Sequence, residues 1–425
     1  MHRSDLQALS KDELIELVLK LQRPETNSRN SSKPPSTDRK ERRENAKPGG
    51  AKPGHEAKFR ALSDTVNEIV DHAPSQCLAC GHSFSGDDPG LMIGEYETVE
   101  LPPVSPFVVR HRRFARTCGT CGLKTKAPLP SAASGTPFGP RIHALAVYLK
   151  TFQALSYERL QGTFRDLFGL TLSQGALMNM FARTAKPFQG EAAKAVLDLR
   201  QAKFAASDET GVRIQGANAY HWVFRCAQAV VHTVDVTRAG QVVRDMMDGH
   251  TPQVWTSDRY AAQQKHGFEH QTCLAHLARD AAFAHEHGAD HVPMRFKLWF
   301  GRVFDLAGDI AQLAGSTITA KRRKLETQID AILASKSDCR LARELQAKIA
   351  RARPQLLTFC SYPGEVEPTN NACERALRPS VIQRKVTNGY RAMWAAKAEA
   401  AVRTTVATAK LTGGQTFSTI LNTIA

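Results

Sequence analysis

Three strand-like runs follow one another between residues 203 and 237, and this succession constrains the fold more than any other feature of the chain. The runs are KFAASDETGVRIQG, AYHWVFRCAQ and AVVHTVDVT, and turn residues separate them. A short helical segment, AGQVVRDMMDGH, comes next. PQVWTSDRY then predicts a fourth strand, and EHQTCLAHLARD predicts a fifth strand that runs into a helix. Three antiparallel strands followed by alternating helix and strand is the order of a ribonuclease H-like α/β core.

A helical insertion separates this core from a second piece of it. Residues 291–362 predict helices with charged faces, among them AKRRKLETQIDAIL and DCRLARELQAKIARARP. The core resumes at VEPTNNACERALRP, residues 366–379, where good N-cap residues precede the helix former ACERAL. Glu374 then falls in the first turn of a helix, where its charge meets the positive end of the helix dipole. Taken alone, this segment is typical of a capped surface helix.

Two further acids give the segment a possible chemical role. Asp208 is expected at the end of the first strand and Asp258 at the end of the fourth, and in this fold those strands are adjacent. Glu374, on a later helix packed against the sheet, would complete a set of three carboxylates. Oxygen ligands of this kind suit Mg²⁺ or Mn²⁺ and not Zn²⁺. Two such ions, roughly 3.5–4 Å apart, promote in-line displacement at a phosphodiester.

Each acid has an alternative interpretation. Aspartates at strand ends often only cap turns. Glu209 is next to Asp208, but we expect it on the opposite side of the strand. Glu367 is a second rival for the third position, but it precedes the helix, so we favour Glu374.

Two Cys-x-x-Cys pairs predict a structural zinc site in residues 61–130. Cys77 and Cys80 form the first pair, and Cys118 and Cys121 form the second. Each short loop aims two thiolates at one ion, as tetrahedral Zn²⁺ requires. The strand-like runs GEYETVEL and PFVVRHRRFAR between the pairs favour a zinc ribbon over two unrelated thiol pairs. Whether the ribbon contacts DNA stays open.

The remaining N-terminal segments are helical or polar. Residues 4–22 predict one amphipathic helix that pairs with a copy of itself or docks elsewhere. Residues 23–60 hold eleven Lys/Arg and five Asp/Glu with almost nothing apolar, which predicts a flexible basic linker and is compatible with a non-specific DNA arm. In residues 138–200, two helices joined at Gly169 resemble a helix-turn-helix, although an ordinary helical hairpin is nearly as good an interpretation.

Charge and composition narrow the class of partner. The formal net charge of +16 favours a polyanion, nucleic acid before membrane, because no apolar run is long enough to span a bilayer. Residues 375–425 alone hold eight Lys/Arg and one Glu, which predicts a DNA-contacting surface or a solubilising helix face. Nine cysteines without a signal peptide favour metal ligands and free thiols over disulfides, and a cytoplasmic protein.

Six short motifs together resemble DDE transposases of the insertion-sequence-66 type, over nearly the whole chain. The motifs are NSSKPPSTD at 30–38, the four cysteines above, SDET at 207–210, SDRY at 257–260, CLAHLARD at 273–280 and TNNACERALRP at 369–379. The resemblance implies that Asp208, Asp258 and Glu374 are the catalytic triad. It also implies an oligomer that holds two DNA ends, with companion proteins of the element as further partners.

The same resemblance marks several residues around the triad. Cys273 and His276 match a Cys-x-x-His signature that lies close to the catalytic edge in several DDE families. Four residues match the run around the glutamate and are expected either to position it or to contact DNA: Asn370, Asn371, Arg375 and Arg378. One departure is that the loop NGYRAMW keeps only Gly389 of a fuller glycine–serine turn.

These observations predict an α/β multidomain protein. The expected parts are an N-terminal helix and basic linker (1–60), a zinc ribbon (61–130), a helical DNA-binding region (131–200), the first part of a ribonuclease H-like core (201–290), a helical insertion (291–362), and the second part of the core with a basic C-terminal helix (363–425). The predicted function is metal-dependent cleavage and transfer of DNA strands at terminal inverted repeats and target DNA. The alternatives are an inactive zinc-ribbon DNA-binding protein and a ribonuclease H-like nuclease that does not join strands.

Overall fold

A computed structural model describes residues 60–84, 90–129 and 136–425, together with a few positions before residue 57. Most of the helix expected over residues 4–22, most of the basic linker and most of the motif at 30–38 lie outside the described residues. Described residues within Lys40–Ser105 form one compact unit, and those within Met1–Arg39 and Pro106–Ala425 form another. No helix in the described part of the chain is long and apolar enough to cross a membrane.

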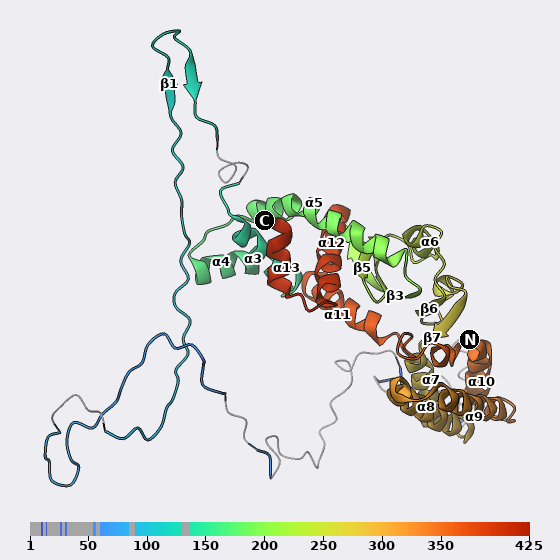
Figure 1. Ribbon diagram of the computed structural model, residues 1–425. Helices are drawn as coiled ribbons and strands as arrows, with labels where there is room; N and C mark the ends of the chain where they lie inside the picture. The colour runs from blue at the N-terminus through green and yellow to red at the C-terminus, as the bar shows by residue number, and fades with distance from the viewer. Residues whose placement is uncertain are drawn as a thin grey trace. The chain divides into compact units, whose positions relative to one another are not determined.

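A five-stranded mixed sheet forms the centre of the larger unit (Figure 1). Its strands are β3 (Phe204–Ile214), β4 (Ala217–Arg225), β5 (Val230–Asp235), β6 (Val254–Ser257) and β7 (Glu269–Thr272). The strand order is β5-β4-β3-β6-β7, with antiparallel pairing of β3, β4 and β5 and parallel pairing of β3, β6 and β7. The five strands predicted from the sequence are therefore confirmed, and β3 is adjacent to β6 as expected.

Helices cover both faces of the sheet. They are α5 (Gln174–Leu199), α6 (Gln241–Met247), α11 (Asn371–Thr387) and α12 (Met393–Lys410). Trp222 and Phe224 of β4 are buried in one apolar cluster with the end of α5 and with α6. Val223, between them in sequence, is buried against α11 on the other face, because neighbouring side chains of a strand alternate. Each side chain of β3 lies on the same face of the sheet as the side chain of its pairing partner on β4.

A helical bundle lies between β7 and α11, and it begins earlier in the chain than the insertion predicted at 291–362. Its helices are α7 (Leu274–His287), α8 (Val292–Asp309), α9 (Gly315–Leu333) and α10 (Arg340–Ala352). Their inward side chains form one core, in which Phe296 and Trp299 are fully buried. The indole Nε1 of Trp299 donates a hydrogen bond to the carbonyl oxygen of Leu325 at 2.9 Å, which satisfies the polar atom of this buried ring.

Three helices precede the sheet, and their junctions follow the sequence. They are α3 (Pro140–Thr151), α4 (Tyr157–Phe168) and α5. Gly169 ends α4 in the left-handed conformation, with φ of 61°. The Ser173 side chain caps α5 by accepting a hydrogen bond from the Ala176 N–H at 3.1 Å. The two predicted helices and their joint at Gly169 are confirmed.

Gly389 is held by close contact with the sheet. Its φ is +100°, and a Cβ at this position would lie 2.2 Å from the Arg213 carbonyl oxygen. The next residue, Tyr390, pairs with Ile214 of β3 and donates its N–H to the same Arg213 oxygen at 2.8 Å. Gly389 therefore lies where the loop backbone is too close to β3 to leave room for a Cβ.

Two strand predictions between the cysteine pairs are wrong. Residues 94–101 form no strand, and of the run at 106–116 only the last two residues enter β1 (Ala115–Thr117). β1 pairs with β2 (Lys124–Lys126) in a short antiparallel hairpin. The other apolar side chains of these runs are exposed, among them Ile93, Tyr96 and Phe107. Strand propensity produces a sheet only where a backbone partner and a buried face exist, and the described residues supply neither here.

The basic C-terminal segment is only partly a surface. Arg403 on α12 is only 2% exposed, so it cannot be part of a surface. The expectation that the cations of residues 375–425 form a surface is therefore wrong for this residue. Its guanidinium lies 2.8 Å from the Glu399 carboxylate and donates to the Gln383 side chain and the Thr151 carbonyl at 2.5 and 2.9 Å. This buried ion pair joins α12 to α11 and to the end of α3.

Replacing Glu399 tests how strongly the pair holds these helices. Glu399→Ala leaves the Arg403 charge buried without a counter-ion, so we expect the free energy of unfolding to fall by about 3–5 kcal/mol in denaturant titrations. The matched control is Glu191→Ala, which breaks an exposed pair with Lys194 at 2.7 Å and is expected to cost less than about 1 kcal/mol. Equal losses in the two variants would contradict a structural role for the buried pair.

Candidate active site

Asp208 lies within β3 and not at its end, which corrects the prediction from the sequence. The parallel pairing of β3 with β6 stops at Ala206 and Thr256, while the antiparallel pairing with β4 continues to Ile214. Asp208 therefore follows the last parallel pair by two residues, next to the place where β6 ends. The strand continues beyond it because β4 is longer than β6.

Asp258 directly follows Ser257, the last residue of β6, as predicted. Its Oδ1 accepts a hydrogen bond from the Tyr260 N–H at 2.9 Å, which fixes the turn after the strand. The neighbouring Arg259 donates to the carbonyl oxygen of Lys348 on α10 at 2.8 Å. The loop that carries Asp258 is thus tied to the helical insertion.

Glu374 lies in the first turn of α11, also as predicted. The helix N-cap is Asn370, but the Asn370 side chain makes no capping hydrogen bond. Its Nδ2 donates instead to the carbonyl oxygen of Ser207, at 2.7 Å. The start of α11 is therefore fixed to β3 at the residue before Asp208.

Three hydrogen bonds connect the chain segments that carry the three acids. The Cys273 N–H donates to the Ser257 carbonyl at 2.8 Å, and the Asn370 N–H donates to the Cys273 Sγ at 3.2 Å. The side chain of Asn370 then reaches Ser207. Ser257 and Ser207 immediately precede the two aspartates, and Asn370 lies one helical turn before Glu374. This chain of bonds holds the three carboxylates in one region.

The pKa of Asp208 reflects its surroundings. Burial raises the pKa of Asp208 well above its usual value, and the carboxylates of Glu209, Asp258 and Glu374 raise it further. A hydrogen bond from the Glu209 N–H opposes this effect. Asp208 is therefore a carboxylate that is costly to ionise in the protein alone, and a nearby cation would relieve the cost.

Glu209 is oriented away from this group, as the alternation of a strand predicts. It is opposite Trp222, on the α5 face of the sheet, whereas Asp208 is opposite Val223 on the α11 face. Its carboxylate forms an ion pair with Arg238 at 2.5 Å and accepts a hydrogen bond from Gln263. Sequence reasoning missed both partners, because they come from loops far from Glu209 in the chain.

The second rival acid lies on the segment that leads into α11. Glu367 is exposed and lies before α11 begins. The geometry therefore favours Glu374 as the third acid over Glu367.

Cys273 and His276 lie next to Glu374. Their ligand atoms and a Glu374 carboxylate oxygen are all within 4.8 Å of one another, the one such group of three among the described residues. His276 Nε2 and an Arg279 nitrogen are each 3.9 Å from Glu374 Oε1. Burial lowers the pKa of His276, and Arg279 lowers it further. Cys273 is fully buried, so a DNA contact by its side chain is excluded.

The other marked residues separate into buried and exposed positions. Asn370 is 2% exposed, so of its two expected roles the structure supports positioning. Arg375 and Arg378 are exposed on α11 beside Glu374, and Asn371 is half-buried at the first position of the helix. The two arginines are thus available to a phosphate backbone next to the acids.

The donor set fits divalent cations that prefer oxygen. The three triad carboxylates do not converge within 4.8 Å, but a pair of ions roughly 3.5–4 Å apart does not require every acid to reach one point. Asp208 is half-buried, and the loss of hydration together with the neighbouring carboxylates raises its pKa.

The two cysteine pairs have the same local geometry. In each, the first cysteine N–H bonds to the carbonyl five residues later, and the N–H of the following glycine bonds back to the first cysteine carbonyl, at 2.8–2.9 Å. Both glycines are left-handed, with φ of 72° at Gly81 and 71° at Gly122. Backbone N–H groups of Cys121 and Thr120 lower the pKa of Cys118 to about 7, and Cys77 is lowered in the same way. Such thiols ionise readily and suit metal binding.

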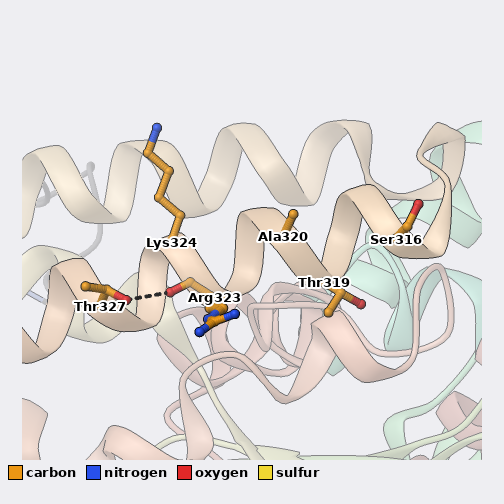
Figure 2. A pocket seen from close by; sticks show the side chains of 6 residues that line it. All are labelled: Ser316, Thr319, Ala320, Arg323, Lys324 and Thr327. Carbon is orange, nitrogen blue, oxygen red and sulfur yellow. Dashed lines mark hydrogen bonds between the residues drawn. The ribbon is translucent and has the colours of Figure 1, made fainter.

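A shallow hollow on α9 has no acid in its lining (Figure 2). It is lined by Ser316, Thr319, Ala320, Arg323, Lys324 and Thr327. Its polar atoms are hydroxyls and cations, and Arg323 and Lys324 are both exposed. The hollow is therefore suited to contact with anions and not to the chemistry expected of the carboxylates.

Comparison with known families gives one match. A family model described as "Transposase IS66 family" matches residues 135–398. The matched range contains the whole sheet, the insertion and all three acids. A comparison with curated proteins found no match.

Asn370→Ala tests the link between α11 and β3. It removes the donor to the Ser207 carbonyl, and we expect the free energy of unfolding to fall by about 1–3 kcal/mol in denaturant titrations. The matched control is Asn371→Ala, one position later, for which we expect a change within about 0.5 kcal/mol. A loss in Asn371→Ala as large as in Asn370→Ala would contradict the positioning role.

Asp208→Asn tests the electrostatic strain of the site. Because the folded pKa is raised, the native state binds more protons than the unfolded state above about pH 4, so this group loses stability as pH rises through the folded pKa. We expect metal-free Asp208→Asn to be more stable than wild type at pH 7 by roughly 0.5–2 kcal/mol, with the difference vanishing below about pH 4. The control is Asp305→Asn, an exposed aspartate on α8. A destabilised Asp208→Asn protein at pH 7 would contradict the strain.

Proposed function

The chain belongs to the IS66 family of transposases, and from this premise we propose that it binds the ends of a mobile element, cleaves DNA strands and joins them to target DNA. The observation that carries the proposal is the grouping of Asp208, Asp258 and Glu374 by the hydrogen bonds around Asn370. Three acids on different elements, brought together beside a basic helix face, are what phosphoryl transfer on DNA requires.

The catalytic domain is proposed to be a ribonuclease H-like core. The strand order β5-β4-β3-β6-β7, with two antiparallel and two parallel neighbouring pairs, supports this. So does the position of the insertion between β7 and α11, because it leaves the sheet intact while supplying a helical surface beside Asp258.

Each acid has a proposed role toward a pair of Mg²⁺ or Mn²⁺ ions. Asp208 would contact both ions, and Asp258 and Glu374 would each hold one. Metal at these positions supplies electrostatic stabilisation of the phosphoryl group and activation of the attacking oxygen. The chain itself orients the carboxylates through Cys273 and Asn370. The exposed Arg375 and Arg378 would hold the DNA backbone against them.

DNA contacts are proposed on two further surfaces. The helices α4 and α5, joined at Gly169, would act as a helix-turn-helix-like reader, supported by their capped junction. The cationic hollow on α9 would contact phosphate. The four cysteines are proposed as Zn²⁺ ligands of a ribbon, supported by the matching geometry of the two pairs.

Assembly and boundaries also remain proposals. Two DNA ends must be held together, so a homo-oligomer is proposed, and companion proteins of the element would join it. We keep the six parts predicted from the sequence as the domain organisation.

Strand cleavage and joining by wild type and Glu374→Gln test the function directly. With the DNA flanking the gene as substrate and Mg²⁺ or Mn²⁺ present, we expect wild type to cleave and join, and Glu374→Gln to bind DNA with at least a 100-fold loss of product. The matched control is Glu367→Gln, an exposed acid outside the group, which should retain wild-type rates.

The products separate the alternatives. Cleavage without joining would identify a nuclease. Binding by all three proteins without cleavage, also after addition of the products of neighbouring genes, would identify an inactive DNA-binding protein. Activity retained by Glu374→Gln would remove Glu374 from the triad.

A further inference from the structure

The group of Cys273, His276 and Glu374 has a donor set that the proposed carboxylate chemistry does not use. Cys273 is the N-cap of α7, and His276 is three residues later, one turn along the helix. Residues at this spacing lie on the same side of a helix. The start of α11 is held against this turn, because the Leu274 N–H donates to the Pro368 carbonyl at 3.0 Å. Glu374 is thereby brought to the two α7 side chains.

The distances suit a single metal ion after a small adjustment. The three ligand atoms lie within 4.8 Å of one another. Around a tetrahedral ion with bonds of about 2.0–2.3 Å, ligand atoms are about 3.5 Å apart, so they must approach by about 1 Å. Glu374 supplies this movement, because its side chain is 30% exposed.

The His276 side chain is 32% exposed, but its buried ring nitrogen lacks a hydrogen-bond partner. His276 Nδ1 is buried and makes no hydrogen bond within the described residues, and Nε2 is 3.9 Å from Glu374, too far for one. Arg279 Nε, one turn further along α7, is buried in the same unpaired state. A ligand between α7 and α11 would account for the unpaired imidazole.

We propose that Cys273, His276 and Glu374 form a binding site for one thiophilic divalent cation of the zinc class, distinct from the carboxylate site and sharing only Glu374 with it. Thiolate and imidazole select zinc-class ions, whereas Mg²⁺ prefers oxygen. Three protein ligands leave a fourth position for water. The Asn370 N–H donates to the Cys273 sulfur and favours the thiolate, whereas burial raises the pKa of this thiol, so the ion itself must supply the remaining stabilisation of the thiolate.

Occupancy of this site removes Glu374 from the triad. A carboxylate bound to the zinc-class ion faces Cys273 and His276 and no longer completes the group with Asp208. Zinc-class ions therefore inhibit strand transfer at concentrations at which Mg²⁺ supports it. This part of the inference depends on the proposed function, whereas the binding of the ion does not.

Metal binding is measured first, on the full chain after removal of metal by chelation. Co²⁺ is titrated into wild type, Cys273→Ser and His276→Ala, and the thiolate-to-cobalt absorption and the ions bound per chain are recorded. Any ions held by the paired cysteines remain in every variant, so the difference reports this site alone. We expect Cys273→Ser to bind one ion fewer per chain and His276→Ala to bind that ion at least ten-fold more weakly.

The matched control is Cys360→Ser, a buried cysteine of the insertion whose sulfur belongs to no ligand group among the described residues. It should bind as many ions as wild type. If Cys273→Ser fails to fold by circular dichroism, His276→Ala decides, because that change leaves the buried thiol in place. Wild-type binding by His276→Ala, or by a folded Cys273→Ser, would overturn the proposal.

Inhibition is then measured as the Zn²⁺ concentration that halves strand transfer at a fixed Mg²⁺ concentration. We expect His276→Gln to require at least ten-fold more Zn²⁺ than wild type. Equal inhibition of both would overturn the inhibitory role. If no strand transfer occurs in any protein, the proposed function fails, and the Co²⁺ measurement still decides the site.

Discussion

The side chain and backbone of Asn370 hold the candidate site together. Its N–H reaches the Cys273 sulfur, and its side chain reaches the Ser207 carbonyl, while Cys273 itself is bonded to Ser257. Apolar contacts such as those of Cys373 and Leu377 also hold α11 on the sheet, but they are not directional. The Asn370 side chain thus does not cap α11 but fixes the start of this helix to β3, which sets the distance between Glu374 and Asp208.

The same bonds force like charges together, and this has a cost. Burial and three neighbouring carboxylates disfavour the ionised form of Asp208. The protein offsets some of the cost nearby, through the Arg238–Glu209 pair on the other face of the sheet and through Arg279 beside Glu374. Among the described residues, no cationic side chain is a main influence on the pKa of Asp208. Strain of this kind, kept within a rigid scaffold, is typical of a site that gains its stability from a bound cation.

Much of this arrangement was predictable from the sequence, because periodicity and turn residues define the strands of a buried sheet. The five strands, the insertion and the position of Glu374 were predicted on that basis. Asp208 was misplaced because strand length depends on the partner, and β4 extends past the end of β6. The roles of Asn370 and Gln263 could not be read, since they depend on contacts between segments over 50 residues apart. The strand predicted at residues 94–101 is wrong because the sequence has a strand pattern there but the described residues provide no partner strand.

The surroundings of Glu374 allow its carboxylate to take part in either of two proposed metal sites. On one side it faces oxygen ligands, and on the other it lies within 4.8 Å of a thiol and an imidazole. Hard and soft donors that share one carboxylate cannot both be satisfied by a single ion, because ion preference follows the donor type. The i, i+3 spacing of Cys273 and His276 on α7 therefore affects which ion Glu374 can bind. Any ion that binds there competes for the one acid of the proposed triad that lies on a helix.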